Sequence, residues 1–424
     1  MDNSHPILIE IACSKGFSKS LPTSDLNQAI HLYLSECKSL PKDHVFRVNC
    51  PKVESVMVCN EITENTPRTD LQLYTYQLHD GSGEEETIEQ DGDEVQIANH
   101  WLLPAREFHG LWESLLFEGT IKEDLLSFMQ TTMLFSKQNV NSNLVACNRL
   151  VLLHGPPGTG KTSLCKALAQ KLAIRMIDHY RHAHLIEINS HSLFSKWFSE
   201  SGKLVQKVFG QIHEICQQRT SLVCVLVDEV ESIVFARESI SNNEPSDSIR
   251  VVNAVLTQLD RIRKYSNVFV LATSNLTGSI DLAFLDRADI VQFIGNPTLG
   301  AIYEIYRSAL LDLQNVDIIS DMEPIPPHSE ATDESVVVKT LKDVARLSIG
   351  LSGRSLRKVP FLAHALFVKQ NATTLLKFLG AMRSAVRRMK ADKEMLDSKN
   401  PAATVTGSAG NRQNGHGPNA SSSI

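Results

Sequence analysis

The sequence predicts an α/β protein whose central domain is a parallel β-sheet covered by helices on both faces. Between residues 150 and 294, short apolar runs alternate with helical stretches, as is typical of parallel strands buried on both faces. A glycine-rich turn connects the first run to a helix. After residue 297 the strand-like runs stop and helical periodicity takes over. The predicted strands are residues 150–153, 185–188, 222–227, 268–272 and 290–294.

The composition is that of a globular protein with more than one domain. The chain has 424 residues, of which 42% are hydrophobic and 21% charged. Its net charge of -6 provides no overall positive field, so we predict no direct binding to nucleic acid or membranes. No apolar stretch reaches the length of a membrane span, and residues 1–16 lack the basic start of a secretory signal. The eight cysteines are scattered, which favours reduced thiols in an intracellular protein.

Residues 1–100 are predicted to form a small N-terminal α+β domain. This segment contains strand-like runs at residues 7–12 and 53–58 and a helical segment at residues 26–40. Residues 80–94 carry eight acidic side chains, three glycines and no Lys or Arg. We interpret residues 80–94 as an exposed acidic loop. No catalytic signature is present in this domain.

The rest of the chain is predicted to form a large domain at residues 101–295, a helical subdomain at residues 296–390 and a disordered tail at residues 391–424. Two helices of the large domain, at residues 204–216 and 252–262, carry apolar residues at about four-residue spacing. The tail is rich in Gly, Ser, Asn and Ala and has almost nothing apolar to bury.

The strongest chemical signal is a phosphate-binding loop between the first predicted strand and its helix. Glycines allow backbone N–H groups to wrap around phosphates, and the helix N-terminus adds partial positive charge. Lys161 is predicted to contact the β- and γ-phosphates of ATP, and the Thr162 hydroxyl to bind Mg²⁺. The predicted nucleotide-binding residues here are Gly155, Pro156, Pro157, Gly158, Thr159, Gly160, Lys161, Thr162 and Ser163.

Two further strands end in residues suited to hydrolysis. Asp228 and Glu229 directly follow the apolar run 222–227, so both carboxylates are expected at the edge of the sheet that carries the loop. Asp228 is predicted to hold the water shell of Mg²⁺, and Glu229 to orient and deprotonate the attacking water. Asn275, after the run 268–272, is predicted to hold that water in place. A simple polar turn is the alternative for Asn275.

The order of these features along the chain resembles that of the AAA+ ATPases. The phosphate-binding loop comes first, followed by the strand that ends in Asp-Glu, the strand that ends in Asn and the helical lid. The chain has no Asn-Lys-x-Asp motif, which recognises guanine in GTPases. This absence argues against a GTPase. Residues 141–366 are similar, more narrowly, to the pachytene checkpoint protein 2 family, above all at residues 185–203, 228–232 and 350–357.

The resemblance implies a homohexamer that binds ATP and Mg²⁺ between subunits and remodels HORMA-domain proteins from a closed to an open form. It implies that the N-terminal domain recruits these substrates together with an adaptor of the same HORMA fold. It also implies substrates in the meiotic chromosome axis and the spindle checkpoint, and a location in the nucleus and the cytoplasm.

The resemblance gives roles to four more residues. Arg287 corresponds to an arginine that reaches the γ-phosphate of the neighbouring subunit, although many relatives have two arginines here, and an ordinary salt bridge is the alternative. Arg354 corresponds to a lid residue that senses ATP, with an exposed helix position as the alternative. Trp197 and Phe198 correspond to a central-pore loop that grips an extended polypeptide. Core packing is the alternative for this aromatic pair.

Two other functions remain open at this point. An ATP-gated binding scaffold would use nucleotide only to hold a ring together, and it would need none of Glu229, Asn275 and Arg287. A nucleic-acid-directed motor would need a local basic surface. The predicted last helix does carry a basic cluster, but without interleaved aromatic residues a solvated face or a subunit contact is favoured. This cluster consists of Arg383, Arg387, Arg388 and Lys390.

Overall fold

The computed structural model describes residues 6–14, 23–50, 52–68, 70–90, 93–141, 144–189, 201–231, 246–275 and 282–399. The chain divides into two compact units, Met1–Ala301 with Gly350–Arg354, and Ile302–Ile349 with Ser355–Ile424. Among the described residues, no helix combines the length and the apolar character that crossing a bilayer requires.

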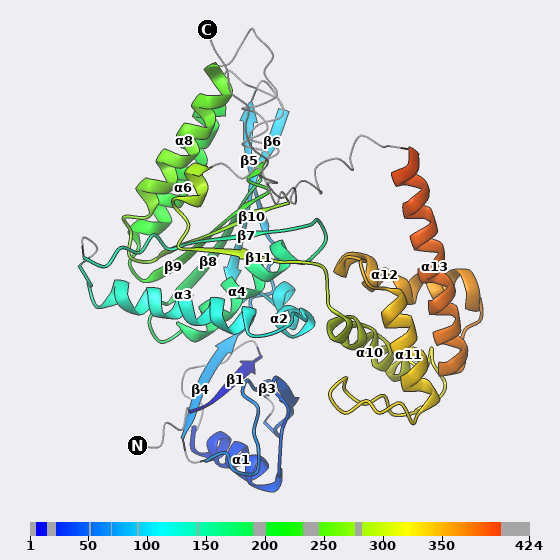
Figure 1. Cartoon of the computed structure of the whole chain (residues 1–424). Helices are drawn as coiled ribbons and strands as arrows, with labels where there is room; N and C mark the ends of the chain where they lie inside the picture. Colours follow the sequence, from blue (N-terminus) through cyan, green and yellow to red (C-terminus); the bar gives the residue numbers. More distant parts are fainter. Residues whose placement is uncertain are drawn as a thin grey trace, which may run out of the picture. The chain divides into compact units, whose positions relative to one another are not determined.

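A seven-stranded sheet forms the centre of the first unit (Figure 1). The five strands predicted from the apolar runs are confirmed, and they lie parallel to one another. Two further strands extend the sheet in antiparallel fashion. In spatial order the strands are β11 (Ile290–Phe293), β7 (Leu150–His154), β10 (Val268–Ser274), β9 (Ser221–Asp228), β8 (His182–Asn189), β6 (Asp93–Leu103) and β5 (Glu84–Gln90).

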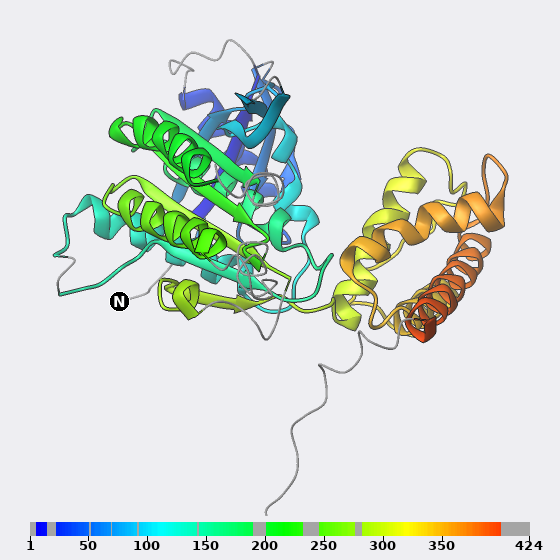
Figure 2. The same ribbon diagram turned by 90° about the horizontal axis from the view of Figure 1, so that it is seen from above.

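Helices cover both faces of this sheet (Figure 2). On one face α6 (Ser201–Gln217) and α8 (Ser246–Ile262) bury the apolar residues that the sequence pattern predicts, among them Val208, Ile212 and Leu259. On the other face lie α2 (Leu111–Ser114), α3 (Ile121–Lys137) and α4 (Lys161–Arg175), together with the short η1 (Arg106–Phe108). A sheet sandwiched in this way is buried on both faces, which explains why its strands are almost wholly apolar.

Most of the acidic segment 80–94 is strand, so the loop prediction was wrong for residues 84–90 and 93–94. Residues 84–90 form β5, which pairs with β6 from Glu84↔His100 to Gln90↔Asp93. The composition was misleading because β5 is the last strand of the sheet, where charged side chains remain in solvent while the backbone pairs on one side. In addition, β5 and most of β6 lie within the predicted N-terminal domain 1–100 but belong to the large sheet.

The N-terminal domain proper is a four-stranded sheet with one helix. The sheet order is β2 (His44–Phe46), β3 (Val53–Val58), β1 (Ile7–Cys13) and β4 (Leu71–Gln77). The side chains of β1 alternate between two environments, as expected for a strand. Ile9 and Ile11 pack under α1 (Thr23–Glu36). From the opposite face, Glu10 ion-pairs with α4 of the large domain and Ala12 packs in a cluster that contains Ile174 of that helix.

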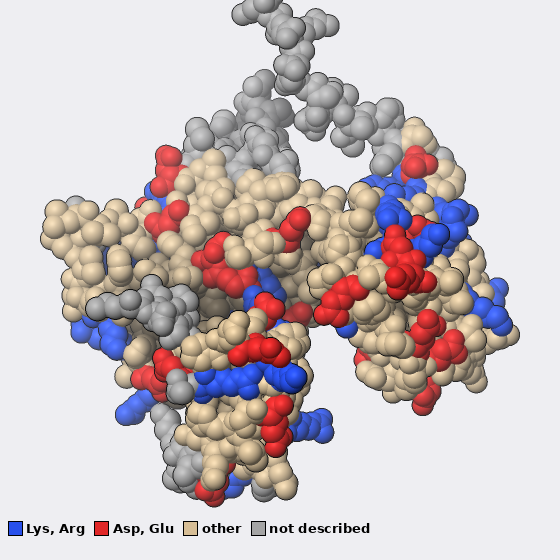
Figure 3. Space-filling view, turned by 60° about the horizontal axis from the view of Figure 1, so that its bottom comes forward, with Lys and Arg blue, Asp and Glu red and all other residues tan. Residues whose placement is uncertain are grey.

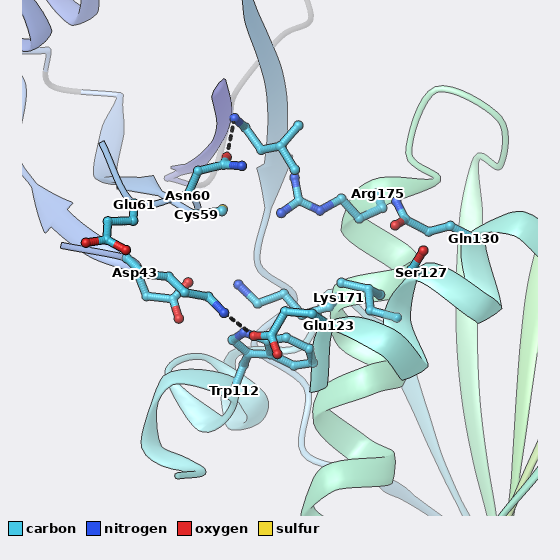
Figure 4. Close-up of a pocket in the computed structure, with 13 residues that line it drawn as sticks. Asp43, Cys59, Asn60, Glu61, Trp112, Glu123, Ser127, Gln130, Lys171 and Arg175 are labelled. Carbon is cyan, nitrogen blue, oxygen red and sulfur yellow. Dashed lines mark hydrogen bonds and ion pairs between the residues drawn. The ribbon is translucent and has the colours of Figure 1, made fainter. Parts of the chain in front are cut away.

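Buried ion pairs cross the seam between this small sheet and α4. Glu10, only 1% exposed, lies 2.7 Å from Lys171 Nζ and 3.0 Å from an Arg175 nitrogen. Glu113 of α2 approaches Lys171 from the other side at 2.9 Å. Burial alone would lower the pKa of Lys171, but the charges of Glu10 and Glu113 outweigh burial and raise it. Beside these pairs is a cavity of about 420 Å³, where Lys171 and Arg175 face Cys59 and Asn60 (Figure 4).

The second unit is helical, as predicted for the segment 296–390. It consists of α10 (Leu299–Asn315) from Ile302 onward, α11 (Val336–Leu347), α12 (Gly353–Ala363) from Ser355 onward, η2 (His364–Val368) and α13 (Leu375–Lys399). The predicted disordered tail 391–424 begins too early, because α13 continues to Lys399. Ala391, Lys393 and Glu394 favour helix, and the glycine-rich composition of the later residues hid this preference. Residues 400–424 lie outside the described residues.

The basic cluster of α13 lies on a surface of mixed charge. Figure 3 shows Lys and Arg next to Asp and Glu on this helical unit. Arg388 lies 4.0 Å from Asp392, and Lys390 Nζ donates to the Ile349 carbonyl at 3.0 Å. These contacts fit a solvated helix face that pairs with its own surroundings.

A pair of histidines in the large sheet predicts a pH-dependent stability. His184 of β8 contacts His100 of β6, with 2.9 Å between their ring nitrogens. Burial, followed by the charges of His100, His182 and His79, lowers the pKa of His184 to about 4. Between pH ~6.5 and this value the unfolded chain binds a proton that the folded chain does not, so stability falls as the pH falls.

We therefore expect His184→Gln to lose less stability than the parent protein between about pH 7.5 and pH 5. Urea unfolding at both pH values measures the difference. An equal loss in both proteins would contradict the assignment.

Candidate active site

The phosphate-binding loop leaves β7 at His154 and enters α4 at Lys161. Its glycines have positive φ angles, 144° at Gly155, 77° at Gly158 and 99° at Gly160. A Cβ atom at Gly155 would lie 2.1 Å from the carbonyl oxygen of Ile294. No other residue fits at Gly155 without moving β11 and the chain that follows it, so the glycines allow the loop to fold closely over the end of the sheet.

The side chain of Lys161 lies inside this loop and is only 4% exposed. Its Nζ donates to the carbonyl oxygens of Gly155 and Pro156, each at 2.8 Å, and to Asn275 Oδ1 at 2.9 Å. Burial lowers the pKa of Lys161, while the carboxylates of Glu231, Asp228 and Glu229 act in the opposite direction. The ammonium group is therefore fixed among oxygen atoms at the mouth of the loop.

The two residues predicted to bind metal lie next to each other. The Thr162 hydroxyl donates to Asp228 Oδ1 at 2.8 Å, and the Thr273 hydroxyl donates to the same oxygen. A hydroxyl and a carboxylate are hard oxygen ligands of the kind that Mg²⁺ takes in nucleotide sites, where it keeps several waters. The residues present thus fit a magnesium ion, which Thr162 and Asp228 would hold.

Glu229 and Asn275 also meet, from neighbouring strands. Asn275 Nδ2 donates to Glu229 Oε1 at 3.2 Å, and Asn275 Oδ1 accepts from Lys161. Glu229 has a positive φ of 54°, which directs the chain away from the strand directly after Asp228. The structure therefore brings Lys161, Asn275 and Glu229 into one hydrogen-bonded group at the carboxyl edge of the sheet.

Sequence reasoning missed several residues that build this edge. Thr273 accepts from the backbone N–H of Glu229 at 3.1 Å, and Glu231 accepts from the backbone N–H of Asn275 at 2.9 Å. A Cβ atom at Gly160 would lie 3.4 Å from Leu115 and 3.7 Å from Phe117, so an apolar wall flanks the loop. Only the positions of Thr273 and Glu231 near strand ends signalled their involvement.

The remaining residues of the predicted nucleotide site lie in or beside the loop. Thr159 is buried, and its hydroxyl donates to the Pro156 carbonyl at 3.0 Å. Pro157 follows in the same turn, and Ser163 lies in the first turn of α4. The backbone N–H of Arg354 donates to the Gly158 carbonyl at 3.0 Å. The segment that contains Arg354 is thus tied to the loop, and its role in sensing ATP stays a prediction.

Arg287 lies at the other end of the sheet. It follows α9 (Leu282–Leu285) and precedes β11, which runs parallel to β7 with Ile290 opposite Val151. The loop leaves the carboxyl end of β7, whereas Arg287 lies near the amino end, about 16 Å away for five residues of strand. Arg287 therefore does not belong to the group around Lys161 in its own chain.

The predicted pore residues, Trp197 and Phe198, lie outside the described residues. The strand that leads to them, β8, ends at Asn189, which is paired with Asp228. The end of β8 at Asn189 therefore lies at the same edge of the sheet as Asp228.

Comparisons with known proteins support the interpretation of the group around Lys161 as the site of an ATPase. Residues 151–296 match the AAA family, described as ATPase family associated with various cellular activities. Residues 298–390 match the TRIP13-like, AAA+ ATPase lid C-terminal domain. The pachytene checkpoint protein 2 homolog of Homo sapiens is 52% identical over 341 residues, which cover 78% of each chain. The homolog of Danio rerio is 52% identical over 335 residues, or 77% of this chain and 79% of that one.

Solved structures agree with the fold. The structure of C. elegans PCH-2 has a TM-score of 0.79 and 34% identity, and the match covers 91% of this chain and 99% of that chain. A chain from the E. coli MS115-1 HORMA:CdnC:Trip13 complex has a TM-score of 0.51 at 18% identity, covering 67% of this chain and 93% of that chain. The second match is one of fold alone.

The hydrogen-bonded group at the loop, the match to the AAA family and the identity with these relatives all indicate an ATPase. The lid match and the agreement over nearly all of C. elegans PCH-2 narrow the assignment further. This chain belongs to the pachytene checkpoint protein 2 family of AAA ATPases.

Proposed function

We propose that this chain hydrolyses Mg²⁺-ATP in a homohexameric ring and uses the energy to convert HORMA-domain proteins from a closed to an open form. The observation that carries the proposal is the group formed by Lys161, Asn275 and Glu229 beside Thr162 and Asp228. A scaffold that only binds ATP has no use for a carboxylate and an amide in this position.

In the proposed reaction, Glu229 accepts a proton from a water molecule whose oxygen attacks the γ-phosphorus. The bond between the γ-phosphorus and the bridging oxygen breaks, and ADP leaves. Asn275 holds the attacking water, and Lys161 exchanges carbonyl oxygens for phosphate oxygens. Thr162 and Asp228 would hold Mg²⁺, which would supply positive charge to the phosphate oxygens.

The position of Arg287 supports a ring. A guanidinium group near the amino end of β11 cannot serve the loop of its own chain, but it can serve the site of a neighbour. An arginine supplied in this way can accelerate phosphoryl transfer by ~10³–10⁵-fold, because its charge meets negative charge that develops in the transition state.

The substrate class rests on the relatives. The E. coli complex contains a Trip13 chain together with a HORMA protein, and the name of the curated relatives refers to the pachytene checkpoint. We propose HORMA proteins of the meiotic chromosome axis and the spindle checkpoint as substrates, recruited with a HORMA-fold adaptor through the N-terminal domain. This role requires the protein in the nucleus and in the cytoplasm.

The test measures ATP turnover with and without a purified HORMA protein and its adaptor, together with conversion of the HORMA protein to the open form. We expect both partners together to stimulate turnover severalfold. Trp197→Ala is expected to keep basal turnover and to lose conversion, because the grip on the polypeptide depends on aromatic contact.

Leu144→Ala removes an apolar side chain that is 82% exposed. It serves as the matched control and should convert substrate normally. Absence of stimulation would contradict the substrate class. Normal conversion by Trp197→Ala would contradict the pore role.

A further inference from the structure

Arg287 is held by a carboxylate of its own chain. Its Nε donates to Asp260 Oδ1 at 3.0 Å, and its Nη2 donates to Asp260 Oδ2 at 2.9 Å. Two parallel hydrogen bonds fix both the position and the plane of the guanidinium group. Asp260 lies near the end of α8, on the apolar-faced helix that packs on the sheet.

Asp260 is itself fixed from a second side. Arg263 Nη1 donates to Asp260 Oδ1 at 3.0 Å, and Arg263 Nη2 donates to Asn148 Oδ1. The hydrogen bond from Arg287, and then the neighbouring charges, lower the pKa of Asp260 against the effect of partial burial. The carboxylate is therefore ionised and oriented at neutral pH.

The loop that carries Arg287 is also anchored. The Asp289 carboxylate accepts from the backbone N–H groups of Asn148 at 2.8 Å and Leu150 at 3.1 Å, at the start of β7. The backbone N–H of Asp289 donates to the Leu150 carbonyl at 2.9 Å. The backbone near Arg287 is thus tied to the sheet, and the long side chain is the part that requires separate support.

We infer that Asp260 is the positioning residue of Arg287, holding the guanidinium group in the orientation in which it completes the active site of a neighbouring copy. This inference rests on the proposed function, because it requires that Arg287 act between subunits. An unrestrained arginine side chain loses rotamer entropy when it becomes fixed in the transition state. A carboxylate that holds it beforehand removes most of this loss from the transition state.

The test is a double-mutant cycle between Asp260→Asn and Arg287→Ala. Alone, Asp260→Asn is expected to lower turnover at saturating ATP by about 10–100-fold, as a small misplacement of a catalytic group does. The affinity for ATP and the ring size in solution should stay unchanged. In the Arg287→Ala background, Asp260→Asn should have no further effect on turnover, because the group that it positions is gone.

Two further variants separate positioning from a general structural effect. Asp260→Glu keeps the charge and should recover part of the lost turnover. Asp343→Asn removes the carboxylate of an exposed Arg346 pair and should leave turnover at the parent level.

The outcomes distinguish this inference from the function on which it rests. If Arg287→Ala hydrolyses ATP at the parent rate, the arginine does not act between subunits and the proposed ring chemistry fails. If Arg287→Ala is slow but Asp260→Asn is as fast as the parent, only the role of Asp260 is wrong. Additive losses in the double variant would assign Asp260 a separate structural role and overturn the inference.

Discussion

Replacing Glu229 with Gln is expected to lower ATP hydrolysis by ~10²–10⁴-fold, the usual contribution of a general base. Gln keeps the size of the side chain and can still contact Asn275, which lies 3.2 Å from Glu229. It cannot accept the proton of the attacking water. Lys161 and the loop remain intact, so the variant should bind ATP with nearly the parent affinity and retain it.

Single-turnover hydrolysis and equilibrium binding of a fluorescent ATP analogue measure the two quantities separately. Glu214→Gln, an exposed change on α6, is the matched control and should affect neither. Lys161→Ala should instead lose nucleotide binding, because the loop loses the ammonium group that would contact the phosphates. Hydrolysis by Glu229→Gln at the parent rate would show that another group removes the proton.

Replacing Glu10 with Ala is expected to destabilise the fold by about 3–5 kcal/mol, the typical effect of removing one partner from a buried ion pair. The change leaves Lys171, about 5% exposed, and Arg175, about 4% exposed, without the carboxylate that lies between them. Glu113 compensates for Lys171 only. The effect should concentrate at the seam between the N-terminal sheet and α4.

Glu54→Ala is the matched control for this change. It removes a carboxylate from an ion pair with Arg106 near the surface, where the Arg106 side chain is 44% exposed and the Glu54 side chain 32%. The free energy of unfolding should therefore fall by only about 0–1 kcal/mol. Chemical unfolding followed by Trp fluorescence reports on the seam, because Trp112 lies 5.8 Å from Lys171 Nζ. Equal effects of the two substitutions would mean that the buried pairs do not hold the domains together.

The sequence predicted those features that are encoded over a few consecutive residues. The loop 155–162 and the Asp228-Glu229 pair combine a strand, a turn and a specific side chain within a short stretch, so their positions in the sheet followed from the strand order. The five parallel strands were readable for the same reason. Burial on both faces leaves an uninterrupted apolar run that few other structures produce.

The features that it did not predict depend on contacts between distant segments. Thr273 and Asp260 look like ordinary polar residues until the fold places them against Glu229 and Arg287. Glu10 and Lys171 are 161 residues apart, and nothing local marks them as partners. The edge strand at residues 84–90 was mistaken for part of an acidic loop because an edge strand has little need of apolar side chains.

The register of β7 and β11 also determines which active sites of the proposed ring would be inactivated by defective copies. In the proposed ring a copy would bind nucleotide at one end of β7 and offer Arg287 at the other, so two neighbours would share each site in a fixed direction. Consider a copy whose phosphate-binding loop is defective, next to a neighbour that lacks Arg287. If that neighbour supplies the arginine to the defective loop, both faults fall in one active site. In a closed ring of such covalently linked pairs every defective loop meets a defective arginine, so half of the sites keep both parts intact. If one copy of each pair carries both faults instead, every site lacks one part, so linked pairs of these two kinds should differ in residual turnover.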